Sequence, residues 1–494
     1  MEDKEEVVIN TDDVTGAARR GLWAMASSSV LQQLVTWGLT LVTIRLLTPE
    51  DYGLMSLVES FAPYFAVAAS FDLSSWVVQR QSLGKDEERA AFTLGTTLGT
   101  ISFLFAVLVA PVLSWFYGNN DILLPFILVG FTFFLRGFGS FGEGKLKREM
   151  RFAAIAKVQL VIAIARGITQ VILAWQGYGF WSLIFGLVLA EGIRNLVWFF
   201  LADASIQLNF DKKVFREALK FGLPSAGASL LWILYSGADN LFVGKFFGPD
   251  MLGLYAMAYY LVDLPASRIN QIIRPILLPY YSRLKHDSNK LKEGFLNTVT
   301  GTTALLFPCT AGIGIIANDF VPLVLGDSWK GLETPIIVMS LSGILRVSME
   351  NMYPLFLSLG QTKYSFYCNC FSAIVFPALV ISLGLSYGLP GVYASWFVFL
   401  PLAIAVSLHF MHRASGISPR DIFGAMLKPA FSALLMMSFG YTLSYYFLDN
   451  SVPWLSLILV IVGSAALYGL SLRVLLGRRF IKICLSAGIG GREI

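Results

Sequence analysis

Long apolar stretches alternate with short polar connections over almost the whole chain. An α-helix needs roughly 20 consecutive apolar residues to cross the hydrocarbon core of a bilayer. By this measure the chain contains fourteen transmembrane helices, and it is predicted to be an all-α integral membrane protein. The predicted spans are 22–45, 52–78, 92–116, 122–141, 152–175, 179–202, 217–243, 252–282, 294–317, 333–358, 364–386, 389–411, 424–447 and 453–476.

The charges of the connections support this count. Connections after odd-numbered spans hold almost no Lys or Arg, whereas most of those after even-numbered spans hold several. Because Lys and Arg gather on the cytoplasmic side of a membrane protein, the alternation places both termini in the cytoplasm. The basic set comprises Arg80, Lys85, Arg89, Lys145, Lys147, Arg148, Arg151, Lys212, Lys213, Arg216, Arg283, Lys285, Lys290, Lys292, Arg413 and Arg420.

One short phrase occurs twice. Arg45-Leu-Leu-Thr-Pro49-Glu-Asp-Tyr-Gly53-Leu returns 200 residues later as Lys245-Phe-Phe-Gly-Pro249-Asp-Met-Leu-Gly253-Leu. Proline followed by an acid suits the first turn of a helix, and internal symmetry of this kind is typical of transporters. The repeat predicts two pseudo-symmetric six-helix lobes around a central cavity, followed by two further helices. The predicted parts are a tail (1–21), an N-lobe (22–202), a linker (203–216), a C-lobe (217–411), two appended helices (412–476) and a second tail (477–494).

Composition narrows the class of function. The chain is 56% hydrophobic and only 14% charged, about half the charge of a soluble domain. No predicted connection exceeds some 15 residues, and no nucleophile-elbow, zinc-protease or P-loop motif occurs, which argues against a membrane enzyme. The net charge of +5 follows from the basic cytoplasmic loops, so nucleic acid is not an expected partner. The four cysteines are expected to be small buried hydrophobes, and no metal or cofactor is predicted.

Ionisable side chains inside spans cost about 2.5 kcal/mol or more at the bilayer centre, so they mark partners or pathways. Glu191 and Arg194 are three residues apart, and Arg346 and Glu350 are four apart, so each pair can neutralise itself on one helix face. Arg166 has no acid on its own span and must meet an acid from another helix or bind an anion. The remaining candidates are Glu59, Asp72, Arg136, Asp239, Asp263, Arg268 and Arg274. For Asp72 and Arg136, snorkelling or a bridge within the lobe is the alternative, and Asp239 has Lys245 as an expected partner.

Two spans carry polar faces. The eighth span holds Asp263, Arg268 and Arg274 together with three prolines, which predicts a bent helix beside a wet cavity; a kinked packing helix is the alternative. The first span offers Gln32 and Gln33 near mid-membrane, which suit a cavity wall and ordinary helix–helix hydrogen bonding equally. The basic segment 211–217 is predicted to be an amphipathic linker, with a plain topogenic loop as its alternative.

The repeated phrase and the six-six-two plan resemble the multidrug/oligosaccharidyl-lipid/polysaccharide exporter superfamily. Within it, the chain is similar to bacterial polysaccharide flippases of the Wzx type, especially the colanic-acid branch. The likeness rests also on Phe221-Gly-Leu-Pro224, Asp239-Asn-Leu241, Tyr255-Ala-Met-Ala-Tyr259, Ile272-Ile-Arg-Pro-Ile-Leu-Leu-Pro279, Phe320-Val-Pro-Leu-Val-Leu-Gly-Asp-Ser-Trp329 and Ile344-Leu-Arg346.

This resemblance implies a carrier of undecaprenyl-pyrophosphate-linked oligosaccharide repeat units, which moves them from the cytoplasmic to the outer leaflet of the inner membrane by alternating access. It implies cations in the cavity for the pyrophosphate, and it places the last two helices beside the lipid tail. The candidate partners are the lipid-linked oligosaccharide, membrane lipids, a polysaccharide polymerase and a chain-length regulator. The expected substrate contacts are Arg166, Arg268, Arg274, Arg346, Gln32 and Gln33.

The buried acids match the buried arginines in number, so a strongly cationic cavity is not evident from the sequence. Glu59, Asp72, Asp263, Glu191 and Glu350 are therefore candidates for ion coupling or gating. Alternative functions are a cation-coupled multidrug exporter of the same superfamily and a flippase for the peptidoglycan precursor lipid II. The buried arginines disfavour the first, because its substrates are cationic.

Overall fold

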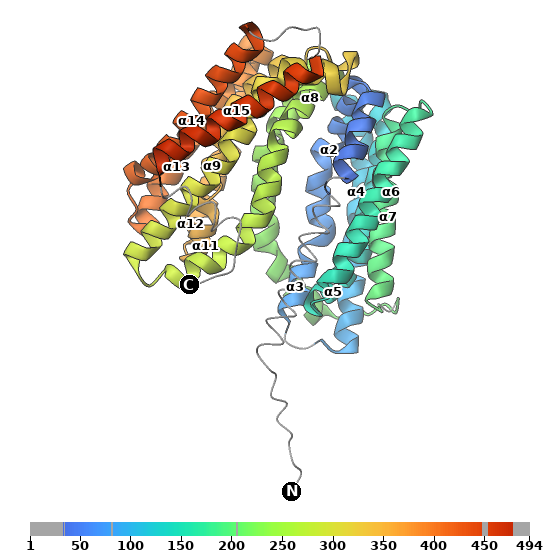
Figure 1. Ribbon diagram of the computed structural model, residues 1–494. Coiled ribbons are helices and arrows are strands. Elements are labelled where there is room, and N and C mark those ends of the chain that lie inside the picture. Colours follow the sequence, from blue (N-terminus) through green and yellow to red (C-terminus); the bar gives the residue numbers. More distant parts are fainter. Residues whose placement is uncertain (1–32, 34, 81–82, 204–205, 447–452, 478–494) are drawn as a thin grey trace. The chain divides into compact units, whose positions relative to one another are not determined.

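The structure is a computed structural model, and it describes residue 33 and residues 35–80, 83–203, 206–446 and 453–477 (Figure 1). Within this part of the chain the secondary structure is helical, without strands, as expected. A helical segment, Val35–Leu46, comes first. The α-helices that follow are α2 (Pro49–Ser70), α3 (Leu73–Gln79), α4 (Lys85–Tyr117), α5 (Leu123–Arg148), α6 (Phe152–Trp175), α7 (Trp181–Leu201), α8 (Lys212–Leu284), α9 (Ser288–Phe320), α10 (Glu333–Val347), α11 (Met352–Ser358), α12 (Thr362–Tyr387), α13 (Leu389–Ser415), α14 (Pro419–Tyr446) and α15 (Pro453–Leu476).

Eleven helices in the described residues are long and apolar enough to cross a membrane. The difference from the fourteen predicted spans has identifiable reasons. Helix α8 contains two predicted spans, joined at Gly248, whose φ of 80° and ψ of 178° are not helical. The predicted span 333–358 is divided into α10 and α11, and part of the first predicted span lies outside the described residues. No break accompanies Pro265, Pro275 or Pro279, since Gly248 is the non-helical position within α8.

The predicted span 52–78 is interrupted between α2 and α3. Phe71 and Asp72 have positive φ values of 43° and 56°, the left-handed region that most residues avoid. The carbonyl oxygen of Phe71 lies so close to Gly222 that a Cβ added there would be 1.9 Å away. A glycine is therefore required where α8 passes the break.

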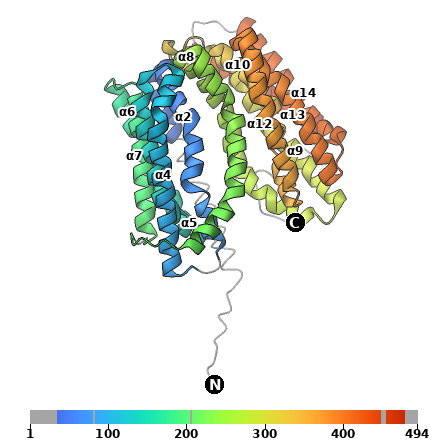
Figure 2. The same cartoon turned by 180° about the vertical axis from the view of Figure 1, so that it is seen from behind.

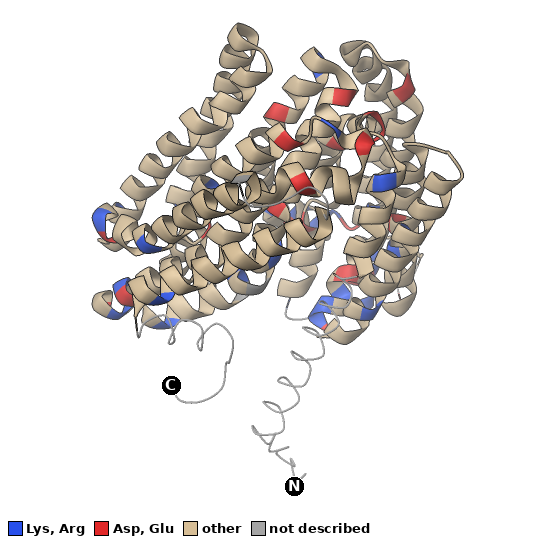
Figure 3. Ribbon diagram, turned by 45° about the horizontal axis from the view of Figure 1, so that its top comes forward, with Lys and Arg blue, Asp and Glu red and all other residues tan. Residues whose placement is uncertain are grey.

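The chain divides into two compact units, each described here by itself. Unit 1 comprises Met1–Thr48 and Val58–Leu230, and unit 2 comprises Pro49–Leu57 and Leu231–Ile494. Helices α2 and α8, both labelled in Figure 2, each contribute residues to both units. In each unit, much of the Lys and Arg lies at helix ends, with long uncharged stretches between (Figure 3).

Unit 1 is held by close contact between α4 and α5. A Cβ placed on Gly137 of α5 would lie 2.3 Å from the carbonyl oxygen of Gly95 and 2.7 Å from the Cα of Gly99. Small residues of this kind let two membrane helices approach to backbone contact. The start of α8 belongs to the same unit, because its Val214 and Ala218 pack into the apolar cluster of α3, α4 and α5.

Unit 2 contains the contact between the two copies of the repeated phrase. A Cβ on Gly53 would lie 1.8 Å from the carbonyl oxygen of Pro249, and a Cβ on Gly253 would lie 1.8 Å from that of Pro49. Helix α2 begins at Pro49, as the phrase predicts, and the second copy begins a helix directly after the break at Gly248. The proline of each copy of the phrase thus contacts the glycine of the other copy.

Candidate functional site

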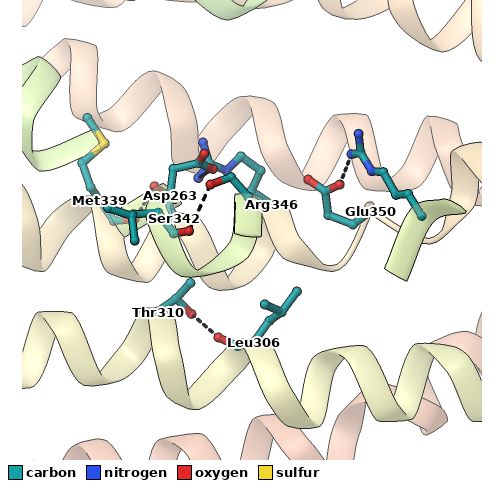
Figure 4. Close-up of polar contacts among 10 residues, drawn as sticks. Asp263, Leu306, Thr310, Met339, Ser342, Arg346 and Glu350 are labelled. Atoms are coloured by element: carbon teal, nitrogen blue, oxygen red, sulfur yellow. Dashed lines mark hydrogen bonds and ion pairs between the residues drawn. The ribbon is translucent and has the colours of Figure 1, made fainter. Parts of the chain in front are cut away.

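The charged residues of α8 and α10 form two ion pairs in unit 2. The Arg346 guanidinium of α10 donates to Asp263 of α8 over 2.6 Å. Arg274 of α8 donates to Glu350, which follows the end of α10. Figure 4 shows both pairs, the second at the label of Glu350. Each arginine therefore meets an acid from the other segment.

The local pairing of Arg346 with Glu350 was predicted wrongly, because the helix ends between them. Helix α10 stops at Val347 and turns lead from Ser348 to Asn351, so four-residue spacing no longer puts both side chains on one face. Pro354 is the sequence signal for this helix end. It has no backbone N–H to donate to the Glu350 carbonyl, so it disfavours a continuous helix through Glu350. Asn351 secures the turn by donating to Thr302 of α9 over 2.5 Å, and both side chains are buried.

The Arg346 side chain is well enclosed. Its side chain is 16% exposed, and its guanidinium lies 4.6 Å from the centroid of the Tyr259 ring. The ring face adds a cation–π interaction to the ion pair with Asp263. The charge of Arg346 is neutralised by Asp263. A substrate anion can therefore form a full ion pair with Arg346 only if it displaces Asp263.

Arg268 has a different environment. Its guanidinium makes one long hydrogen bond, 3.4 Å to the amide oxygen of Gln271 one turn ahead. Its Nε is buried without a hydrogen-bond partner in the described part of the chain. An unpartnered buried N–H is costly, so this guanidinium is prepared to accept an oxygen ligand. Unlike Arg274 on the same helix and Arg346 of α10, Arg268 forms no ion pair with an acid among the described residues.

Unit 1 holds its charges differently. Glu191 accepts from Arg194 over 2.5 Å on α7, and the local pairing predicted for them is confirmed. Asn195 donates to the Glu191 carboxylate over 3.3 Å and to its backbone carbonyl over 2.8 Å. Arg166 of α6 interacts electrostatically with Glu59 of α2, without an ion pair between them in the described residues. This proximity agrees with the first of the two predicted alternatives, an acid from another helix, and the second, binding of an anion, stays a prediction.

Other expected residues lie apart from these pairs. Asp72 caps the start of α3 through its backbone carbonyl, which accepts from Ser75 and Trp76. Arg136 is exposed on α5. Gln33 has a buried amide nitrogen without a partner in the described residues, and Gln32 lies outside them.

Sequence reasoning missed a buried network around Asp239, which is 1% exposed. Its carboxylate accepts from the Tyr255 hydroxyl over 2.6 Å and from the Asn240 N–H over 2.9 Å. The Trp396 indole donates to the Tyr255 hydroxyl over 2.9 Å. Sequence proximity suggested only Lys245 as a partner, because Tyr255 and Trp396 come from later segments that spacing cannot connect.

An apolar groove runs between α9, α14 and α15. It encloses about 380 Å³, and Pro308, Cys309, Gly312, Met436, Val460 and Tyr468 are among its lining residues. The hydroxyl of Tyr468 donates to the carbonyl of Ala304 over 2.7 Å. The groove can therefore hold a hydrocarbon chain but offers almost nothing to a charged ligand.

Comparison with known proteins agrees with this architecture. Residues 42–333 match the family model described as polysaccharide biosynthesis protein. The lipopolysaccharide biosynthesis protein WzxC of Escherichia coli is 24% identical over 381 residues, which are 72% of this chain and 74% of WzxC.

Solved structures of low sequence identity share the fold. The lipid II flippase MurJ in an inward closed conformation has a TM-score of 0.74 at 14% identity, covering 92% of this chain and 99% of MurJ. An inward-facing multidrug resistance transporter of the MATE family, from the MOP superfamily, has a TM-score of 0.60 at 13% identity, covering 81% of this chain and 94% of the transporter. Both are transporters, and at these identities the likeness shows that this chain has the same fold. The chain belongs to the family of polysaccharide biosynthesis proteins.

Proposed function

We propose that this protein is a flippase that moves undecaprenyl-pyrophosphate-linked oligosaccharide repeat units from the cytoplasmic to the outer leaflet of the inner membrane, with both termini in the cytoplasm. The observation that carries the proposal is the uncommitted guanidinium of Arg268 in a membrane-spanning segment. A pyrophosphate is the part of such a substrate that needs cationic, bidentate hydrogen-bond donors. Arg268 is assigned as the first contact of the pyrophosphate.

Arg274 and Arg346 extend the site along the same region of unit 2. While no substrate is bound, the carboxylates of Glu350 and Asp263 occupy the positions on Arg274 and Arg346 that a substrate anion would take. A phosphate oxygen that replaces either carboxylate keeps the guanidinium neutralised, and the displaced carboxylate then needs water, a proton or a cation, which agrees with the expected role of Asp263 and Glu350 in ion coupling. In unit 1, Arg166 and Gln33 stay the substrate contacts that the sequence predicts.

The apolar groove of α9, α14 and α15 suits the polyprenyl tail. Its volume and apolar lining fit hydrocarbon, and each buried methylene contributes about 0.8 kcal/mol. The product of the flippase is a substrate for a polysaccharide polymerase, which, with a chain-length regulator, is the expected functional partner. A drug exporter would meet cationic substrates, for which Arg268 is an unfavourable neighbour.

The test is complementation in the host. The gene is deleted, surface polysaccharide is scored with an antibody or lectin, and sensitivity to cationic dyes is scored separately. Wild type is expected to restore the polymer, and Arg268→Ala is expected to lose at least tenfold at equal protein level. Arg413→Ala is the matched control, because Arg413 is exposed in the last turn of α13.

Two outcomes would overturn the proposal. Full polymer export by Arg268→Ala, or by Arg166→Ala and Arg274→Ala, would remove the anion site. Normal polymer in the deletion strain together with raised dye sensitivity would assign the protein to drug export.

A further inference from the structure

The linker between α7 and α8 presents a surface that takes no part in the proposed pyrophosphate site. Three apolar side chains there are largely exposed: Ile206 at 67%, Leu208 at 63% and Phe210 at 65%. Four exposed cations follow in the first turns of α8, namely Lys212, Lys213, Arg216 and Lys220. These seven residues are called the linker surface.

The cations of the linker surface lie on one side of the helix. At 3.6 residues per turn, the four positions span an arc of about 100°. Val214 and Ala218 lie on the opposite side and are buried in the apolar cluster of unit 1. The start of α8 is therefore amphipathic, as the sequence predicts, with its apolar side against the protein and its basic side outward.

Hydrogen bonds fix the linker to unit 1. The backbone N–H of Asn209 donates to the Thr93 hydroxyl over 2.9 Å, and its side-chain amide donates to the Asp86 carbonyl over 3.0 Å. Asp211 caps the helix by accepting from the Lys213 N–H over 2.8 Å. With Asn209 held toward the protein, the apolar side chains of Leu208 and Phe210 are kept at the surface.

The position of this surface favours a lipid as its occupant. Helix α7, a candidate membrane span, ends at Leu201, and the next candidate span begins at Lys212. The linker therefore lies between the ends of two spans, at the height where a bilayer meets water. Apolar side chains beside a row of cations match a membrane interface that contains anionic lipids.

We infer that the linker surface binds the anionic phospholipid interface, with Ile206, Leu208 and Phe210 inserted among the acyl chains and the cations of α8 on the headgroup phosphates. The inference is independent of the proposed flippase function. It identifies the linker as a membrane anchor of unit 1. A loop that only sets the orientation of the spans would need the positive charges but not the three exposed apolar side chains.

The experiment measures depth in the bilayer. A full-length variant with its four cysteines replaced by alanine carries a nitroxide label at Ile206→Cys, Leu208→Cys or Phe210→Cys, in vesicles of phosphatidylcholine with or without phosphatidylglycerol. Collisions with oxygen, which concentrates in hydrocarbon, are compared with collisions with a water-soluble nickel chelate. Lys290→Cys is the control position, since that side chain is 73% exposed in the first turn of α9.

The expected result is a several-fold higher ratio of oxygen to nickel collisions at the three linker positions than at the control, rising further with phosphatidylglycerol. Replacing all four cations of the linker surface by glutamine is expected to abolish this rise. The control Lys330→Gln, which removes an exposed cation outside the linker surface (74% exposed), is expected to preserve it. Nickel access equal to the control in both vesicles would overturn the inference. Low access to both reagents would also overturn it, because the surface would then be covered by protein.

Discussion

Helices α4 and α5 in unit 1 and helices α8 and α10 in unit 2 are joined by opposite means. In unit 1, Gly137 meets Gly95 and Gly99 at backbone distance, so nothing lies between the helices that a ligand could replace. In unit 2, Asp263 and Arg274 of α8 reach Arg346 and Glu350 through flexible ionic side chains. A phosphate can take the place of a carboxylate, but nothing can take the place of a backbone contact. We therefore expect a rigid contact in the first region and, under the proposed function, exchangeable binding of phosphate in the second.

The first prediction tests the rigid region and has the largest expected effect. Gly137→Ala places a Cβ 2.3 Å from the Gly95 carbonyl oxygen, so α4 and α5 must separate. We expect a loss of about 3 kcal/mol, at the upper end for overpacking, seen as a lower midpoint of thermal unfolding in detergent. Gly192→Ala in α7 is the control, because the nearest atom to its Cβ is 3.9 Å away. Equal midpoints for the two variants would mean that the glycine contact does not hold unit 1 together.

The second prediction tests the exchangeable region. Asp263→Asn leaves Arg346 without its carboxylate, and because Asp263 is 36% exposed the cost is expected to be about 2 kcal/mol, below that of a fully buried pair. A double-mutant cycle with Arg346→Gln is expected to give a coupling of about 1 kcal/mol. Thermal unfolding of the four proteins measures it. Additive effects of the two substitutions would show that the pair contributes no interaction, and the contrast with unit 1 would lose its basis.

The two regions also differ in what the sequence could predict. Length and hydropathy were enough for most helices: the predicted span 152–175 and helix α6 have the same bounds. The pairing of Glu191 with Arg194 followed from spacing because α7 is continuous between them. The pairing of Arg346 followed from the same rule and failed, because α10 ends one residue later.

Contacts between distant segments could not be predicted at all. The repeated phrase indicated two similar helix starts, but nothing in it indicates that Pro49 lies against Gly253 and Pro249 against Gly53. The same holds for Asp239, whose partner Tyr255 is found only once the two parts of α8 are placed side by side. Spacing predicts neighbours on one helix, whereas the site depends on which helices meet.

The third prediction concerns the local pair of unit 1. Glu191→Gln removes the carboxylate from Arg194 but keeps a side chain that can bond Asn195, so we expect a loss of about 1 kcal/mol. The Arg194 guanidinium, 6.0 Å from the centroid of the Trp198 ring, retains that contact. Thermal unfolding of the variant is compared with that of Asp263→Asn. A larger loss for Glu191→Gln would reverse the ranking of local and cross-helix pairs.

The fourth prediction has the smallest effect and lies outside both regions, at the start of α9. The Asp287 carboxylate accepts from the backbone N–H groups of Lys290 and Asn289, over 3.1 and 3.0 Å, and these bonds hold the pKa of Asp287 below its ordinary value of 3.8. Because the folded-state pKa is lowered, the stabilisation is present above the ordinary value and is lost as the pH falls through the folded-state pKa. A carboxyl NMR titration is expected to give a midpoint below 3.8, and Asp287→Ala is expected to speed hydrogen exchange in the first turn of α9.

The arginine pairs of unit 2 take no part in this titration, so export by Asp287→Ala at neutral pH is expected to equal that of wild type. A midpoint at or above 3.8 would mean that the carboxylate does not cap the helix.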